Sequence, residues 1–139
     1  HLIDIIIWLF GKVQNVELLS SLTDDEYPSA SFKISYPEFA CNIFSLDFKN
    51  FEIFELDIIG SKGRIRVEEG GKSIKFYSVE DSKNYVGYKN LALNDIHEGT
   101  MDHFMKTGLL NIINHKDMPS LEDDLYIQGL INKLLSKAH

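Results

Sequence analysis

The chain has 139 residues, a length typical of about one domain and sufficient to bury a core without disulfide bonds or metals. Its 44% content of hydrophobic residues favours a folded globular protein over a disordered tail. Its 14 basic and 21 acidic residues give a net charge of −7, which argues against a nucleic-acid partner because phosphate binding needs clustered Lys and Arg.

Residues 2–10 are apolar at every position except Asp4 and predict a short helix, followed by Gly11 where a left-handed cap would end it. Because the helix is apolar on nearly every side, we expect it to be buried. At roughly ten residues the opening run is too short to span a bilayer, so we expect no membrane partner.

From Lys12 to about Arg66 the apolar residues recur with a period of two, which is typical of strands. The clearest case alternates Phe32, Ile34 and Tyr36 with polar neighbours, as in a strand with one solvated face. Short turn sequences separate the strands and leave no room for crossover helices, so we expect a mainly antiparallel sheet. A hairpin with a Gly-Gly turn is predicted between Arg66 and Val79. The four earlier predicted strands lie in "VELLSSL", "SASFKISY", "ACNIFSLDF" and "FEIFELDIIG".

Residues 80–95 are polar and irregular, and they predict a loop with one short strand. Two helices follow, the first over about residues 99–115, and the second starting at Ser120, an N-cap residue with Asp123 at the reciprocal capping position. The expected apolar stripes are Met101, Phe104, Met105, Leu109, Ile112 and Ile113 on the first helix, and Leu121, Leu125, Leu130, Leu134 and Leu135 on the second.

For several motifs we prefer a structural interpretation to a functional one. "EGGKS" lacks the first glycine of a phosphate-binding loop and predicts a hairpin turn. "HEGTMDH" lacks the spacing that places two imidazoles one turn apart, so we expect no metal site there. Tyr85 and Tyr88 could line a pocket for a polyhydroxylated ligand, but such residues more often cover a sheet edge. The single cysteine, Cys41, can form no internal disulfide, which favours a reducing, cytoplasmic compartment.

His1 and Asp4 stand three residues apart, with Trp8 one turn further along the same helix face. They could simply form a weak exposed pair at a helix start, where the helix dipole favours the carboxylate. Alternatively, they could project into a cleft, where an imidazole can transfer a proton at neutral pH. Periodicity alone favours the first interpretation.

The stretches "HLIDIIIWLFGKV" and "FELDIIGSKGRIRV" resemble motifs in the substrate domain of the glucose-fructose oxidoreductase and inositol dehydrogenase (Gfo/Idh/MocA) family. In that family, H-x-x-D-x-x-x-W-L-x-G opens the domain's first helix. Residues 104–139 also resemble the family's closing pair of helices, so the likeness covers nearly the whole chain.

The resemblance implies an α+β fold with an open, mostly antiparallel sheet and helices packed on one face, a GAPDH-like C-terminal domain whose Rossmann domain is missing from this chain. Residues 1–139 would be the substrate-binding and oligomerisation domain. The implied activity is hydride exchange between a sugar-type hydroxyl or ketone and NAD or NADP, with His1 as catalytic residue and Asp4 as substrate-binding residue. The implied partners are a small polyhydroxylated substrate and further copies of the chain, in a homo-oligomer formed through the sheet face.

Two features of the family pattern are not found in the sequence. The family usually has another Asp four residues before the histidine, and a Lys in an E-K-P stretch after its nucleotide domain; the chain starts too late for the former and contains no E-K-P. We therefore expect no cofactor-binding residues in the chain, and no activity from it alone. Two alternatives remain: a non-catalytic dimerisation or sugar-binding module of the same fold, and an unrelated α+β domain with a chance motif.

Overall fold

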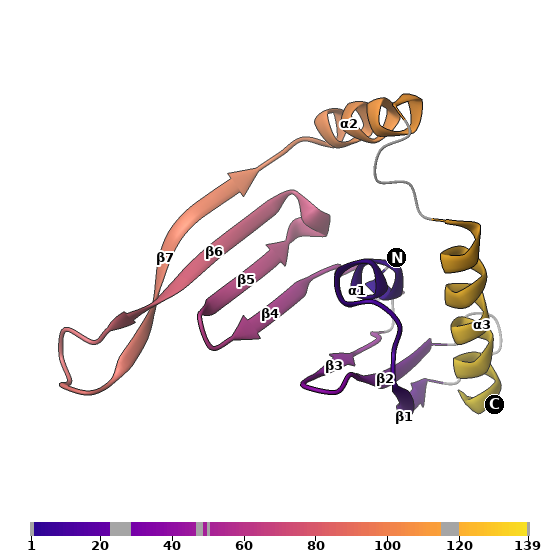
Figure 1. The fold of residues 1–139 in the computed structure, drawn as a ribbon, viewed down its shortest axis with the longest axis horizontal. Helices are drawn as coiled ribbons and strands as arrows, with labels where there is room; N and C mark the ends of the chain where they lie inside the picture. Colours follow the sequence, from indigo (N-terminus) through magenta and orange to yellow (C-terminus); the bar gives the residue numbers. More distant parts are fainter. Residues whose placement is uncertain (1, 23–28, 47–48, 50, 115–119, 139) are drawn as a thin grey trace. The chain divides into compact units, whose positions relative to one another are not determined.

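The computed structural model describes residues 2–22, 29–46, 49, 51–114 and 120–138, and its elements are shown in Figure 1. The chain is α+β, as the sequence predicts. None of the helices within these described ranges has the length and apolar character that crossing a membrane requires. The helices are α1 (Leu2–Phe10), α2 (Met101–Ile113) and α3 (Leu121–Ala138); the strands are β1 (Asn15–Leu22), β2 (Ser29–Ser35), β3 (Ala40–Ile43), β4 (Leu56–Gly60), β5 (Gly63–Glu68), β6 (Ser73–Asp81) and β7 (Lys89–Glu98).

The chain divides into two compact units, residues 1–52 with 119–139, and residues 53–118. Each unit has its own antiparallel sheet, ordered β1-β2-β3 in the first and β4-β5-β6-β7 in the second. The sequence predicts a single open sheet, and the described strands form two instead. The predicted strands over 40–48 and 51–60 are shortened to β3 and β4, and the described residues between them belong to no strand.

The core of the first unit lies on one face of the β1-β2-β3 sheet. Ile34 is 0% exposed and is paired with Val16 on β1 and Cys41 on β3. Phe32 lies two residues along on the same face and is also buried. The alternation read from the sequence therefore marks the buried face correctly.

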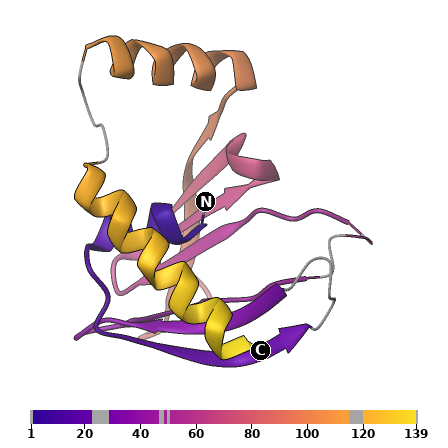
Figure 2. The same cartoon turned by 90° about the vertical axis from the view of Figure 1, so that its right-hand side faces the viewer.

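The two helices of the first unit contribute to this core, and Figure 2 shows α3 crossing the sheet with α1 beside it. From α1 only Ile6 and Ile7 are buried, whereas Trp8, Leu9 and Phe10 are exposed. The expectation that this helix is buried all round is therefore wrong. One side of α1 is sufficient to pack against the core, as is usual for a surface helix.

The stripe predicted for α3 is shifted. Leu130 and Leu134 are buried as expected, but Leu121 and Leu125 are exposed, and Tyr126 and Ile127 pack against the core in their place. The helix start is as predicted: the Ser120 hydroxyl accepts a hydrogen bond from the Asp123 backbone N–H at 3.1 Å, and the Asp123 carboxylate accepts one from the Ser120 backbone N–H at 3.3 Å. The buried residues of α3 thus differ from the leucine stripe that the sequence spacing predicts. The capping box, by contrast, correctly predicts where the helix begins.

In the second unit, the predicted hairpin around the Gly-Gly turn is present, and Gly70 and Gly71 both have positive φ. Gly63 is required for another reason: a Cβ there would lie 2.1 Å from the Tyr77 carbonyl oxygen. The loop predicted over 80–95 is confined to residues 82–88, because residues 80–81 belong to β6 and residues 89–95 belong to β7, which pairs along the length of β6.

A β-bulge explains why β7 is longer than the one short strand predicted in this segment. The register between β6 and β7 shifts at Phe76 and Tyr77, so Leu91, Leu93 and Ile96 share one face although their spacing is two and then three. A strict period of two would not identify this strand. The predicted helix over 99–115 is present as α2, with Thr100 as its N-cap. Its expected stripe is exposed at Met105, Leu109, Ile112 and Ile113, the members whose side chains the structure describes.

We expect Ile34→Ala to destabilise the first unit by about 2–4 kcal/mol, because a fully buried Ile side chain would leave a cavity among Val16, Cys41 and the helices. Trp8 is the chain's only tryptophan and lies in α1, so urea unfolding followed by its fluorescence reports on this unit. Ile59→Ala is the matched control, since Ile59 is 73% exposed. Equal losses for the two variants would contradict this assignment of the core.

Candidate functional site

The motif at the chain start lies on α1, whose sides differ in burial. Asp4 is in the first turn and is exposed, and Trp8, one turn further along, is 73% exposed. Ile6 and Ile7 are on the buried side. His1, the candidate catalytic residue, lies outside the described residues, so the structure does not test its pairing with Asp4.

The C-terminal end of α1 is held by backbone and tyrosine contacts. The Gly11 N–H donates to the Ile7 carbonyl at 2.7 Å with a φ of 78°, the left-handed cap that the sequence predicts. The Tyr36 hydroxyl donates to the Gly11 carbonyl at 3.1 Å, and the Val13 N–H donates to the Tyr126 hydroxyl at 2.9 Å. One tyrosine comes from the end of β2 and the other from α3, so both fix the position of α1 on the core.

Charge and aromatic contacts add to this anchor. Lys12 pairs with Glu122 at 3.1 Å and lies over the Tyr126 ring, 5.5 Å from its centroid. The hydrogen bond to Glu122 raises the pKa of Lys12. Phe10 packs edge-on against Phe39, with ring centroids 4.9 Å apart. The helix that carries Asp4 is thus fixed at its C-terminal end.

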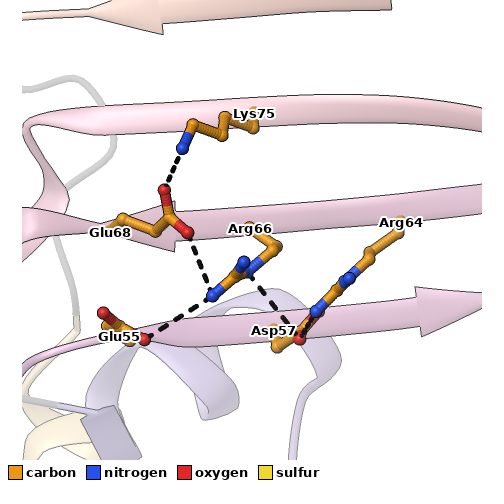
Figure 3. Close-up of polar contacts among 6 residues, drawn as sticks. All are labelled: Glu55, Asp57, Arg64, Arg66, Glu68 and Lys75. Carbon is orange, nitrogen blue, oxygen red and sulfur yellow. Dashed lines mark hydrogen bonds and ion pairs between the residues drawn. The ribbon is translucent and has the colours of Figure 1, made fainter. Parts of the chain in front are cut away.

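The second unit contains a network of charged side chains that the sequence interpretation missed, which we call the charge ladder and show in Figure 3. Arg64 binds both carboxylate oxygens of Asp57, one of them through Nε at 2.7 Å. Arg66 lies 3.0 Å from Glu68, which also binds Lys75. The six residues of the charge ladder are Glu55, Asp57, Arg64, Arg66, Glu68 and Lys75.

Hydrogen bonds within the charge ladder shift the pKa values of two acids and two bases toward their charged forms. The hydrogen bond from Arg64 lowers the pKa of Asp57, and that from Lys75 lowers the pKa of Glu68. Arg64 and Lys75 have raised pKa values for the same reason. A sequence signal existed: Arg64, Arg66 and Glu68 alternate with apolar residues, so the period of two places all three on one face.

The remaining motifs lie outside the charge ladder. Cys41 packs against the core, and burial raises the pKa of its thiol. Tyr85 and Tyr88 lie in the β6–β7 turn with their rings 6.1 Å apart, and each is 68% exposed. Within the described ranges, no group of three or more His, Cys, Asp or Glu side chains could hold a metal ion.

The first histidine of "HEGTMDH" forms a side-chain pair with an acid two residues before it on β7. The His97 ring lies 2.8 Å from the Asp95 carboxylate and packs edge-on against Phe76. The hydrogen bond with His97 lowers the pKa of Asp95. Both side chains are about two-thirds exposed at the edge strand β7, with values of 64% and 62%. We therefore interpret them as a hydrogen-bonded pair on the surface.

No protein-family model matches the chain, and comparisons with curated proteins and with solved structures give no significant match. The family resemblance therefore rests on the motif residues alone.

We expect Arg64→Gln to raise the pKa of Asp57 toward its ordinary value, because the bidentate hydrogen bond is lost. NMR titration of the Asp57 carboxyl carbon measures this directly, with Lys83→Gln, an exposed change outside the charge ladder, as the control.

The direction in which stability depends on pH follows from the lowered pKa of Asp57. The pKa of Asp57 in the folded chain lies below that in the unfolded chain, so the ion pair stabilises the fold above the unfolded value. This contribution disappears as the pH falls through the folded pKa. An unchanged Asp57 titration in Arg64→Gln would contradict the assigned cause.

Proposed function

We propose that the chain forms the substrate-binding side of an NAD(P)-dependent oxidoreductase acting on a sugar, sugar-nucleotide or cyclitol. The observation that carries this proposal is the division of α1 into two sides: Ile6 and Ile7 are buried, while Asp4 and Trp8 are exposed one turn apart. A helix of this kind can present polar groups to a ligand from a fixed position. The α+β fold and antiparallel sheets support the finer proposal of a GAPDH-like C-terminal domain.

The proposed chemistry combines a nicotinamide cofactor with the side chains of His1 and Asp4. When bound, an oxidised nicotinamide cofactor would supply the acceptor for the hydride that leaves the carbinol carbon. The His1 imidazole accepts the hydroxyl proton as that bond breaks, and it returns the proton in the reduction. Asp4 accepts a hydrogen bond from a neighbouring hydroxyl and so orients the ring. The proposal requires a nucleotide-binding domain in the same protein and, because Cys41 is unpaired, a reducing cytoplasmic location.

The second candidate function is a non-catalytic dimerisation or sugar-binding module. It is favoured by the extent of exposed apolar surface in the second unit, which suits protein contact without chemistry. The two candidates differ in what must precede residue 1. A dinucleotide-binding sequence and a lysine in an E-K-P stretch support the enzyme, and a protein that lacks both supports the module.

In the protein that joins residues 1–139 to its upstream sequence, we expect His1→Ala to lower kcat by about 10²-fold or more and to change the Kd for NAD(P)H little. The reason is that the role proposed for His1 is proton exchange with the substrate hydroxyl, and nucleotide binding is assigned to another domain. Steady-state kinetics and fluorescence titration with NAD(P)H measure the two quantities. Equal losses in both would contradict the role of His1.

We expect Asp4→Asn to raise KM several-fold while kcat falls less than in His1→Ala, because a hydrogen-bond acceptor for the substrate is weakened and the proton acceptor is retained. Asp102→Asn is the matched control, since Asp102 occupies the first turn of a different helix, α2. A KM for Asp4→Asn equal to that of the control would remove Asp4 from the substrate site.

A further inference from the structure

The β6–β7 turn, residues 82–88, carries two exposed tyrosines. Tyr85 and Tyr88 are each 68% exposed, and Val86 between them is 102% exposed. Rings as exposed as these cover little of the sheet edge, which is the structural role that the sequence favours for them. Neither tyrosine has a part in the proposed hydride transfer. The β6–β7 turn therefore presents aromatic surface that the folding of the chain does not use.

Hydrogen bonds fix the backbone of the β6–β7 turn. The Ser82 hydroxyl accepts from the backbone N–H groups of Asn84 and Tyr85, both at 3.3 Å. The Ser82 N–H donates to the Tyr88 carbonyl at 2.9 Å, and the Tyr88 N–H donates to the Tyr85 carbonyl at 3.2 Å. Gly87 has a φ of 84° at the third position of the four residues 85–88, where a type II turn requires a positive value. The backbone that carries both rings is thus in place before a ligand binds, which lowers the entropy cost of binding.

The charges around the β6–β7 turn cancel. Residues 80–90 contain two acids, Glu80 and Asp81, and two bases, Lys83 and Lys89. Asp81 and Lys89 are partners in the strand register and form an ion pair. Nucleic acids and anionic membranes also bind exposed aromatic side chains, but they need an excess of Lys and Arg beside them. The local charge balance and the net charge of −7 therefore favour an uncharged ligand.

The two tyrosine rings form a corner. Their centroids are 6.1 Å apart and their planes are inclined by 68°. A flat ligand can stack on one of these rings but not on both. An oligosaccharide can contact both, because its successive sugar rings are turned relative to each other. The C–H groups on the face of a sugar ring are slightly positive and are attracted to the negative face of an aromatic ring, and stacking also removes both apolar surfaces from water.

Polar groups that suit sugar hydroxyls are present in the same turn. The phenol hydroxyls of both tyrosines and the amide of Asn84 can each donate and accept hydrogen bonds, and Asn84 and Lys83 are exposed. Antibody binding loops use the same residue types, Tyr with Ser, Asn and Gly. Tyrosine provides a large contact area at a low entropy cost, and the small polar residues adapt their hydrogen bonds to the ligand.

We infer that the β6–β7 turn is a binding site for a neutral oligosaccharide, with the rings of Tyr85 and Tyr88 stacked on its sugar rings and Asn84 hydrogen-bonded to its hydroxyls. The turn belongs to the second unit, whereas α1 belongs to the first. The site requires neither a nicotinamide cofactor nor His1, so the inference goes beyond the proposed hydride transfer. A site of this kind attaches the protein to a glycan without changing it chemically.

The test is an NMR titration of the isotope-labelled full chain with three neutral oligosaccharides: cellohexaose, maltohexaose and mannohexaose. We expect the amide signals of residues 84–88 to move with at least one of them, with a dissociation constant in the millimolar range because the contact area is small. Tyr85→Ala and Tyr88→Ala should each raise this constant by about tenfold, since each removes one stacked ring.

Phe44→Ala is the matched control, because it removes an aromatic ring of similar exposure, 71%, from the first unit. It should leave the dissociation constant unchanged. Tyr85→Phe and Tyr88→Phe keep the rings and should retain most of the affinity; losses equal to those of the Ala variants would refute stacking. Circular dichroism and the thermal midpoint confirm that each variant is folded.

Signals that stay in place with all three oligosaccharides overturn the inference, as do shifts that both Ala variants leave unchanged. Two further titrations use single-stranded oligo(dT) and vesicles of phosphatidylcholine with phosphatidylserine. If either of these binds the β6–β7 turn and the oligosaccharides do not, the turn recognises a polyanion, contrary to the inference. None of these outcomes bears on hydride transfer, which the His1→Ala kinetics test separately.

Discussion

The packing of Ile6 and Ile7 against the first sheet is the interaction on which the candidate site depends. Because this contact uses one side of α1, the other side, with Asp4 and Trp8, is left exposed. Tyr36 and Tyr126 then fix the turn after the helix by hydrogen bonds to Gly11 and Val13. A helix of nine residues is marginal by itself, so its position comes from these tertiary contacts and not from helix propensity.

Local chemistry made much of the fold predictable. Gly11 marked the end of the first helix, Ser120 and Asp123 the start of the last, and the Gly-Gly pair the hairpin between β5 and β6. Each of these signals acts within a few residues, so sequence alone contains it. The alternation of Phe32 and Ile34 was equally informative, because the period of two is a property of one strand.

The features that the sequence did not predict share a different cause. They depend on contacts between segments that are distant in the chain. The bulge opposite β6 brings Leu93 and Ile96 to one face although they are three residues apart. A period of two therefore does not reveal the full length of β7. Whether α1 is covered on one side or all round depends on how many elements pack on it, and its own apolar content does not reveal this. The candidate site shows the same limit: the motif indicated Asp4, but only the structure shows that Asp4 and Trp8 lie opposite the buried side.

Residue types alternate along the strands of both sheets, but the outcome differs between the two. In the first sheet, the apolar face of β2 is covered by α1 and α3, and burial there supplies the stability of the unit. In the second sheet, alternate positions of β5 hold Arg64, Arg66 and Glu68, and the pairing register brings them to one face of the sheet. The same strand period thus gives a covered apolar core in one unit and a face of paired charges in the other, and the difference is set by which residue types occupy the alternate positions.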